Sequence, residues 1–134
     1  MPEADRFFDP LRRRSVAATP EERVRQWFIG VLSAQAGVPL HMMMSEVPMK
    51  YGLKNWRADI VVWASDGSAL AVTECKRPGV ALDADVQRQA LRYQGVLGVR
   101  YIFLTNGGDT RAFVRSGSAF VPLDHIPSYL EMTA

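Results

Sequence analysis

The stretch of sequence that decides the fold spans residues 57–76 and reads RADIVVWASDGSALAVTECK. Two runs rich in β-branched residues predict strands at 57–64 and 70–76, and Asp66-Gly67 between them predicts a hairpin turn. Asp59 lies inside the first strand, and Glu74 and Lys76 close the second. Since side chains alternate along a strand, Glu74 and Lys76 share one face, and the hairpin lets Asp59 approach that face near Glu74.

Helix signals and a further strand precede this hairpin. Thr19-Pro20-Glu21-Glu22 combines a helix N-cap, a proline at the first helical position and acids in the first turn. The helix is expected to stop at Gly37, and alternation over residues 45–51 predicts a strand. Residues 1–18 show no period and are expected to form an N-terminal arm laid on the surface or on a partner.

The sequence after the hairpin predicts one more helix and three more strands. The helix opens at Leu82-Asp83, runs to about residue 97 and ends at Gly98. A buried strand follows at 101–105, with weaker strands near 111–115 and 119–122. The order α, β, β, β, α, β indicates an α/β fold with one mixed central sheet flanked by helices, in a single domain over residues 19–134.

Composition excludes several classes of protein. The chain has 134 residues, of which 48% are hydrophobic and 22% charged, as in a globular domain rather than a disordered chain. The single cysteine, Cys75, excludes an internal disulfide, and neither a signal peptide nor a long apolar run is present. We therefore expect a cytoplasmic protein without a membrane partner. The formal net charge of +2 does not by itself indicate nucleic-acid binding, although thirteen of the sixteen cations are arginine.

The polar residues inside the predicted strands suggest metal chemistry. Mg²⁺ takes one or two protein carboxylates and keeps waters for substrate phosphates, so Asp59 and Glu74 fit a minimal site that the Cys75 carbonyl could complete. Lys76 could hold the attacking water or stabilise the charge that develops on a phosphodiester. The implied reaction is phosphodiester hydrolysis. The alternative is a cross-strand ladder of ion pairs on an exposed sheet face.

Each predicted helix also carries a polar residue on its apolar face. On a helical wheel Glu21 falls inside the apolar stripe, whereas Glu22 lies on its flank and can serve the capping box. Gln89 and Tyr93 fall on the apolar face of the second helix, four residues apart. The alternatives are that Glu21 points to solvent in the first turn and that Gln89 bonds to neighbouring backbone.

Taken together, these residues resemble the PD-(D/E)XK nuclease superfamily in its RecB-like branch. Within it, the chain looks like the N-terminal nuclease domain of the R subunit of type I restriction enzymes. The segments that carry the resemblance are, in chain order, Phe8-Asp9-Pro10-Leu11-Arg12, residues 19–26, Arg57-Ala58-Asp59-Ile60, Glu74-Cys75-Lys76-Arg77-Pro78, Gln89-Ala90-Leu91-Arg92-Tyr93 and Thr105-Asn106-Gly107.

The resemblance implies a restriction-endonuclease-like αβββαβ core and a metal-dependent DNA endonuclease. It makes Asp59 and Glu74 ligands of Mg²⁺, with Mn²⁺ as a substitute, and Lys76 the catalytic lysine. Glu21 matches the glutamate of the first helix and would join the metal site and the catalytic set, with Glu22 as the fallback. Gln89 and Tyr93 match the motif that flanks the site. Ala58 stands where the family name has proline.

The resemblance also leaves alternatives for partners and activity. No P-loop is present, so the ATP-driven translocase of full R subunits is not expected here. DNA is the expected partner, together with a second copy of the chain or a separately encoded restriction-system or motor subunit. A non-catalytic nucleic-acid-binding or protein-interaction module on the same fold is the alternative. The arginines expected to hold DNA phosphates are Arg12, Arg13, Arg14, Arg57, Arg77, Arg88 and Arg92.

Overall fold

The structure is a computed structural model that describes residues 5–134, except the side chains of Tyr51, Tyr93 and Val96. In chain order its elements are β1 (Arg6–Asp9), β2 (Arg14–Ala17), α1 (Pro20–Gly30), β3 (Met43–Tyr51), β4 (Lys54–Trp63), β5 (Ala69–Cys75), α2 (Ala84–Gln94), β6 (Tyr101–Thr105), β7 (Thr110–Ser116), β8 (Ala119–Leu123) and α3 (Tyr129–Thr133). A π-helical turn, Val31–Gln35, continues α1, and short 3₁₀ turns lie at Leu40–Met42 and Gly95–Leu97.

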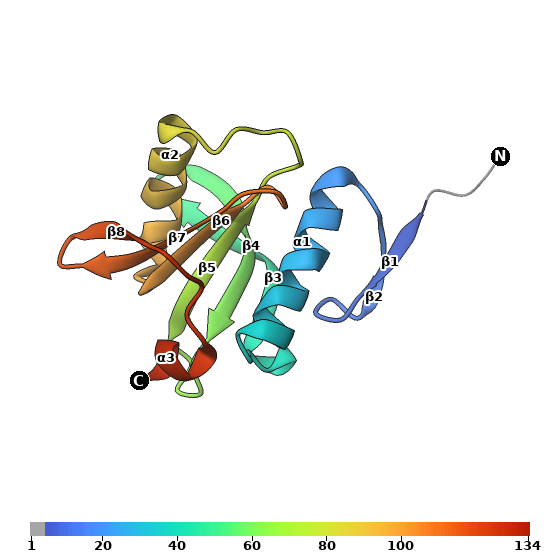
Figure 1. Ribbon diagram of the computed structural model, residues 1–134, viewed down its shortest axis with the longest axis horizontal. Coiled ribbons are helices and arrows are strands. Elements are labelled where there is room, and N and C mark those ends of the chain that lie inside the picture. The colour runs from blue at the N-terminus through green and yellow to red at the C-terminus, as the bar shows by residue number, and fades with distance from the viewer. Residues whose placement is uncertain (1–4) are drawn as a thin grey trace.

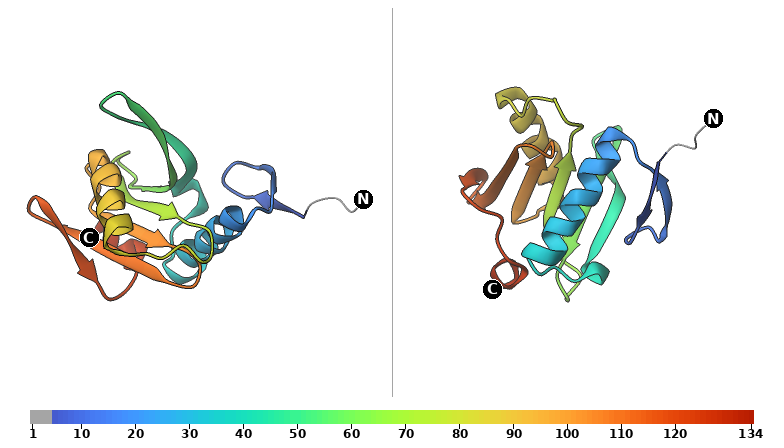
Figure 2. Two further views of the ribbon diagram at one scale, coloured as in Figure 1. Left: turned by 90° about the horizontal axis from the view of Figure 1, so that it is seen from above. Right: turned by 45° about the vertical axis from the view of Figure 1, so that its right-hand side comes forward.

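Six strands form one mixed sheet in the order β3-β4-β5-β6-β7-β8. All neighbours are antiparallel except β5 and β6, which are parallel. Parallel neighbours need a long crossover, and α2 supplies it. α1 covers one face of the sheet and α2 the other (Figures 1 and 2). The predicted α/β fold with a mixed central sheet flanked by helices is therefore confirmed.

Two apolar layers hold the helices on the sheet. On the α1 face, Phe28 packs edge-on against Phe103 with ring centroids 6.1 Å apart, and both rings are fully buried. On the α2 face, Val72, Ile102 and Phe113 form the centre of a second cluster. Because alternate residues of β5 and β6 enter different layers, both central strands are buried on both sides.

The predicted boundaries of α1 agree with the structure. The Thr19 hydroxyl accepts the Glu22 backbone N–H at 3.1 Å, and Pro20 takes the first helical position. Gly37 ends the helical segment with φ +74°, a conformation that costs glycine little. The strands lie within three residues of the predicted ranges, and Gly98, with φ +69°, ends the second helical segment.

Both ends of the chain contain structure that the sequence patterns did not indicate. The segment expected to be an aperiodic arm contains β1 and β2, which form an antiparallel hairpin beside α1 (Figure 1). Its turn is held by Asp9, a fully buried carboxylate that accepts the Leu11 N–H at 2.8 Å and pairs with Arg12. At the other end Ser128 caps α3, whose Met132 enters the core on the α1 face.

None of the described helices is both long enough and apolar enough to pass through a bilayer.

Candidate functional site

The site lies at a fork between β4 and β5. Their pairing begins at Ile60 and Thr73, so the strands separate toward Asp59 and Glu74. Beyond the fork the Cys75 N–H donates to Asp59 Oδ2 at 2.7 Å instead of to a backbone carbonyl of β4. The hydrogen bond places the Asp59 carboxylate in the gap between the two strands.

Glu74 and Lys76 lie at the end of β5 on one face, as the alternation predicts. Lys76 Nζ is 3.4 Å from Glu74 Oε1, and each side chain keeps roughly a quarter to a third of its surface exposed. The Lys76 N–H donates to the Thr105 carbonyl at 2.8 Å, which fixes this end of β5 against β6. A charged pair is thus held at the surface, and the partly buried Asp59 is close enough for the charge of Glu74 to raise its pKa.

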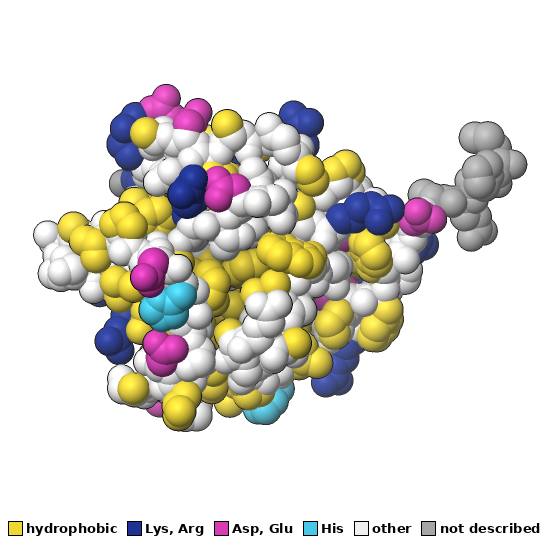
Figure 3. Space-filling view, viewed as in Figure 1, with side chains coloured by type: hydrophobic (Ala, Val, Ile, Leu, Met, Phe, Trp, Pro, Cys, Tyr) yellow, Lys and Arg dark blue, Asp and Glu magenta, His cyan; other side chains and the backbone are white. Residues whose placement is uncertain are grey.

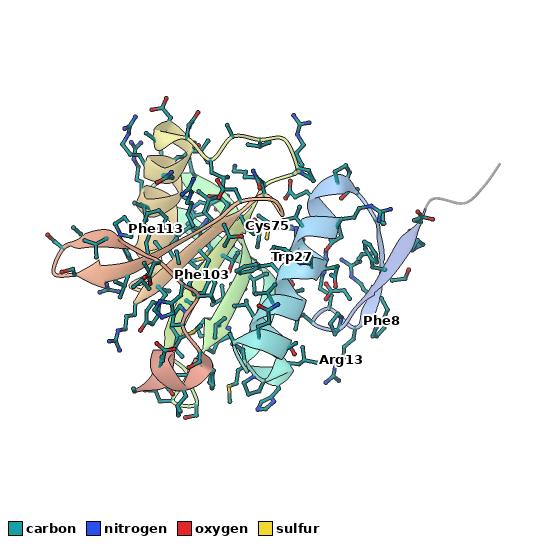
Figure 4. All side chains as sticks on the ribbon, in the orientation of Figure 1. Phe8, Arg13, Trp27, Cys75, Phe103 and Phe113 are labelled. Carbon is teal, nitrogen blue, oxygen red and sulfur yellow. The ribbon has the colours of Figure 1, made fainter. Side chains whose placement is uncertain are left out.

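Burial and nearby negative charges raise the pKa of Asp59. The pKa of Asp59 is raised to about 6, mainly by burial and to a smaller extent by the carboxylates of Glu21 and Glu74, against the opposing effects of the Cys75 N–H and Arg25. Three carboxylates therefore lie within electrostatic range of one another. Burial also raises the pKa of the Cys75 thiol well above its usual value, with the Asp59 charge adding to the effect. The thiol packs in the core on the α1 face (Figure 4), so Cys75 can offer the site only its backbone.

Arg25 of α1 is a member of the site that the sequence argument did not single out. It is 5% exposed, and its guanidinium lies 3.3 Å from Asp59, 3.0 Å from Glu46 and 3.6 Å from Glu22. Glu21 is within 3.9 Å of the same group. A buried arginine four residues after Glu21 faces the site from α1, and its charge balances several carboxylates at once.

Glu46 owes its position to an irregularity in β3. The pairing of β3 with β4 skips residues 46 and 59, and Glu46 adopts φ +52°, which is uncommon for a residue with a side chain. In this conformation its carboxylate accepts from Arg25 and Arg57, each at 3.0 Å. Those two hydrogen bonds lower the pKa of Glu46, against the effect of its own partial burial.

Of the two candidate glutamates on α1, the buried one is Glu22. Glu22 accepts from Arg12 at 2.6 Å and from Gln26 at 3.1 Å, so its carboxylate serves this network rather than the helix cap. The Glu21 side chain is half exposed, although its charge acts on Asp59. The inward position that the wheel predicts for Glu21 is therefore wrong, and the alternative, a glutamate that points to solvent in the first turn, agrees with the structure.

On α2 the inward glutamine is Gln94 and not Gln89. Ala90 and Gln94 are buried, whereas Gln89 is exposed and lines a hollow of ≈ 210 Å³ together with Glu74, Lys76 and Gln94. Tyr93 belongs to the same helix, but its side chain lies outside the described residues. Gln94 follows Val86 and Ala90 at helical spacing, a signal that could have identified it from the sequence.

The seven arginines proposed for phosphate contacts differ in their surroundings. Arg12 is turned inward and bonds Asp9, Glu22 and Glu46, so its guanidinium joins the hairpin to α1 and β3. Arg57 and Arg88 are exposed but pair with Glu46 and Asp85. The remaining four are exposed: Arg13, Arg14, Arg77 and Arg92. On the face drawn in Figure 3 the cations are scattered between hydrophobic side chains rather than gathered in one basic patch.

The donors at the fork fit a hard divalent cation. Asp59, Glu74 and the Cys75 carbonyl are oxygen donors of the kind Mg²⁺ prefers, and the charge of Glu21 acts on Asp59 from α1. The described residues contain no group of three or more His, Cys, Asp or Glu side chains arranged to hold a metal ion. A cation here would thus rest on one or two carboxylates, a backbone carbonyl and water.

The fold and the site define an α/β domain with an acid-rich fork between two inner strands, β4 and β5, of a mixed sheet. The family model described as type I restriction enzyme R protein N terminus (HSDR_N) matches residues 20–127, so the chain belongs to that family. The chain is also similar to a solved structure described as a fragment of an HsdR subunit of a type I restriction enzyme from Vibrio vulnificus YJ016.

That likeness has a TM-score of 0.61 at 20% identity and covers 84% of this chain. It shows the shared fold. The chain spans about a quarter of that structure's length, since 24% of that chain is covered. No curated protein matches the sequence.

Proposed function

We propose that the chain is a metal-dependent DNA nuclease domain of the PD-(D/E)XK type. The observation that carries the proposal is the hydrogen bond from the Cys75 N–H to Asp59 at the fork. This hydrogen bond holds Asp59 near a second acid, Glu74, whose charge raises the pKa of Asp59. Lys76 lies 3.4 Å from Glu74. Two carboxylates can hold a divalent cation, and an ammonium group can stabilise the charge that develops on a phosphodiester during hydrolysis.

The residues of the chain have separate tasks in this reaction. Asp59 and Glu74, with the Cys75 carbonyl, would hold Mg²⁺ or Mn²⁺, and Glu21 would contact the cation through one of its water ligands. When bound, such a cation supplies positive charge to the phosphate and makes water more acidic. Lys76 Nζ lies at the exposed side of Glu74, where it can orient the attacking water or stabilise the charge on the phosphate oxygens. Arg25 acts through Asp59, because its guanidinium limits where that carboxylate can point.

The partners we propose follow from the family and from the exposed cations. DNA is the substrate, held mainly through its phosphates by arginines such as Arg77, Arg88 and Arg92. A motor or specificity subunit, or a second copy of the chain, would deliver the DNA. On the face drawn in Figure 3 the cations are scattered, so that face would not hold a duplex by itself.

Metal binding and cleavage test the proposal separately. Thermal unfolding with Mg²⁺ or Mn²⁺ should show stabilisation of the unaltered protein that rises with metal concentration. Asp59→Asn and Glu74→Gln should lose it, whereas Asp109→Asn, a control at an exposed ion pair with Arg111, should keep it. Supercoiled, linear and single-stranded DNA should be cut with metal and not with EDTA. Absence of cutting on all three substrates with both metals would contradict the nuclease proposal.

A specific observation favours one second candidate, a binding module that works without metal. Arg25 already places a positive charge 3.3 Å from Asp59, where it can balance the carboxylates at the fork. This module would retain DNA in EDTA and would be indifferent to Asp59→Asn. The metal titration above distinguishes the two candidates.

A further inference from the structure

Gln94 is a buried polar side chain without a visible task. It is 2% exposed, and its Oε1 atom has no hydrogen-bond partner among the described residues. A buried amide oxygen that lacks a donor is costly and uncommon in proteins. Gln94 also forms part of the wall of the ≈ 210 Å³ hollow beside the fork, so its side chain borders any group that enters the hollow.

The other walls of the hollow combine a flat ring with cations. They come from the start of β4 (Lys54, Asn55, Trp56 and Arg57), from the end of β5 (Glu74 and Lys76) and from α2 (Gln89). Figure 2 shows the β3–β4 hairpin rising from the sheet near α2, so that two separate elements border the space. The hollow is smaller than the sites that hold drug-sized molecules, which occupy about 300 Å³ or more. It suits one flat, polar group attached to an anionic chain.

We propose that the hollow seats an unpaired nucleobase of the DNA strand that lies across Lys76. This inference rests on the proposed nuclease function and adds the form of its substrate. The base would lie against Trp56 and, once the Gln94 amide turns toward the hollow, donate an N–H to its Oε1. Lys54 and Arg57 would lie near the phosphates on either side, and the adjoining phosphate would reach Glu74 and Lys76.

The buried position of Gln94 determines which DNA can use the hollow. In a duplex the bases are stacked and their Watson–Crick N–H groups are paired, so no base can enter the hollow and present that edge to Gln94. A single strand or an extruded nucleotide can present a free base to an aromatic side chain, and such stacking tolerates any sequence. The substrate is therefore DNA that is single-stranded or locally unpaired at the point of cleavage.

The experiment measures binding of fluorescent oligonucleotides to the full chain in EDTA, which prevents metal-dependent cutting. One probe is a thymidine strand of about a dozen nucleotides, and a second is the same strand built from N3-methylthymidine, which stacks but has no N–H to donate. A duplex of equal length is the third. Wild type should bind the thymidine strand more tightly than the duplex, and about threefold to tenfold more tightly than the methylated strand.

Variants locate the effect at Gln94. Gln94→Leu should bind the two single strands equally, whereas the control Gln35→Leu, at an exposed position of the π-helical turn, should discriminate as wild type does. Equal binding of both strands by wild type overturns the inference, and this comparison needs no variant that folds. Equal loss of affinity for both strands in Gln94→Leu also overturns it.

A parallel cleavage assay with Mn²⁺ separates the two proposals. If wild type discriminates between the two single strands but cuts no DNA, the proposed binding of a base in the hollow stands and the nuclease proposal fails. If wild type cuts DNA but does not discriminate between the two single strands, the nuclease proposal stands and the proposed binding of a base in the hollow fails.

Discussion

Arg25 connects Glu46 and Asp59 through the two ends of one guanidinium group. Its Nη1 lies 3.0 Å from Glu46 Oε1 and its Nη2 lies 3.3 Å from Asp59 Oδ1. Glu22 adds a third carboxylate at 3.6 Å from Nε. One buried cation thus connects α1, β3 and β4. It lies where the pairing of β3 with β4 skips residues 46 and 59.

The first prediction concerns the loss of this cation. Arg25→Leu would leave Glu22, Glu46 and Asp59 close together in a poorly solvated space. Removing one partner of a buried ion pair costs about 3–5 kcal/mol, so a fall of that size in the free energy of unfolding is expected by urea titration. Arg25→Lys keeps the charge but cannot reach carboxylates on two sides, and should lose less. A fall below about 1 kcal/mol in Arg25→Leu would show that the network is not a main support of the fold.

The second prediction uses the raised pKa of Asp59. Because the folded protein binds this proton more tightly than the unfolded chain, the ionised carboxylate lowers stability. The penalty develops as the pH rises from about 3.8 to about 6 and is constant above that. Without metal, Asp59→Asn should therefore be more stable than wild type at pH 7.5, by up to about 3 kcal/mol, and the difference should shrink as the pH falls to 4.

Asp66→Asn is the control with the opposite sign. The Ser68 hydroxyl and N–H hold the pKa of Asp66 below its usual value, so ionised Asp66 favours the fold. Its contribution is present above pH about 3.8 and is lost below that. Denaturant titrations of the three proteins from about pH 2.5 to about pH 8 cover both effects, and a stabilisation by Asp59→Asn that is equal at every pH would contradict the electrostatic origin.

The sequence predicts the scaffold well because the scaffold is set by local signals. Periodicity, the Thr19 cap, the Asp66-Gly67 turn and Gly98 each act within a few residues, and the elements they predict are present. The N-terminal hairpin was missed because its two strands are four residues each and their stability depends on Asp9 and Arg12. Long-range ion pairs of this kind leave no periodic signal.

The candidate site was only partly predictable for a related reason. Alternation correctly placed Glu74 and Lys76 on one face, but the position of Asp59 depends on the fork, which is a departure from regular pairing. The positive φ of Glu46 and the inward turn of Gln94 likewise depend on neighbouring elements. Regular patterns predict regular structure, whereas the functional groups lie where the regular pairing stops.

The third prediction separates Glu21 from Glu22. Glu22→Gln should reduce the free energy of unfolding by about 2–4 kcal/mol, because Arg12 and Arg25 lose a buried partner. Glu21→Gln should change stability by less than about 0.5 kcal/mol, since the side chain is half exposed. Its effect should fall instead on metal affinity, measured by titration with Mn²⁺. A loss of metal affinity in Glu22→Gln at full stability would make Glu22 the ligand.

The fourth prediction distinguishes arginines that contact DNA from those that support the fold. Arg77→Ala and Arg92→Ala, at exposed positions, should weaken DNA binding about equally for all sequences. Each should reduce the slope of log affinity against log salt by about 1. Arg12→Ala should lower the melting temperature, because it removes the link between Asp9 and Glu22. Salt titrations followed by anisotropy, with melting curves for all three variants, check both halves.

The fifth prediction concerns Lys76 itself. Lys76→Ala should reduce the rate of DNA cleavage by about 10²–10³, the usual effect of removing one group that stabilises developing charge. DNA affinity should change little, since one phosphate contact among several is lost. Lys76→Arg keeps the positive charge but changes its shape, because a guanidinium is broader and flatter than the ammonium that lies beside Glu74. The cleavage rate of Lys76→Arg should therefore lie between those of Lys76→Ala and wild type. Single-turnover cleavage with Mn²⁺, at protein concentrations above the DNA dissociation constant, measures the rate free of binding. An unchanged rate in Lys76→Ala would remove Lys76 from the chemistry and leave its pairing with Glu74 as a surface contact.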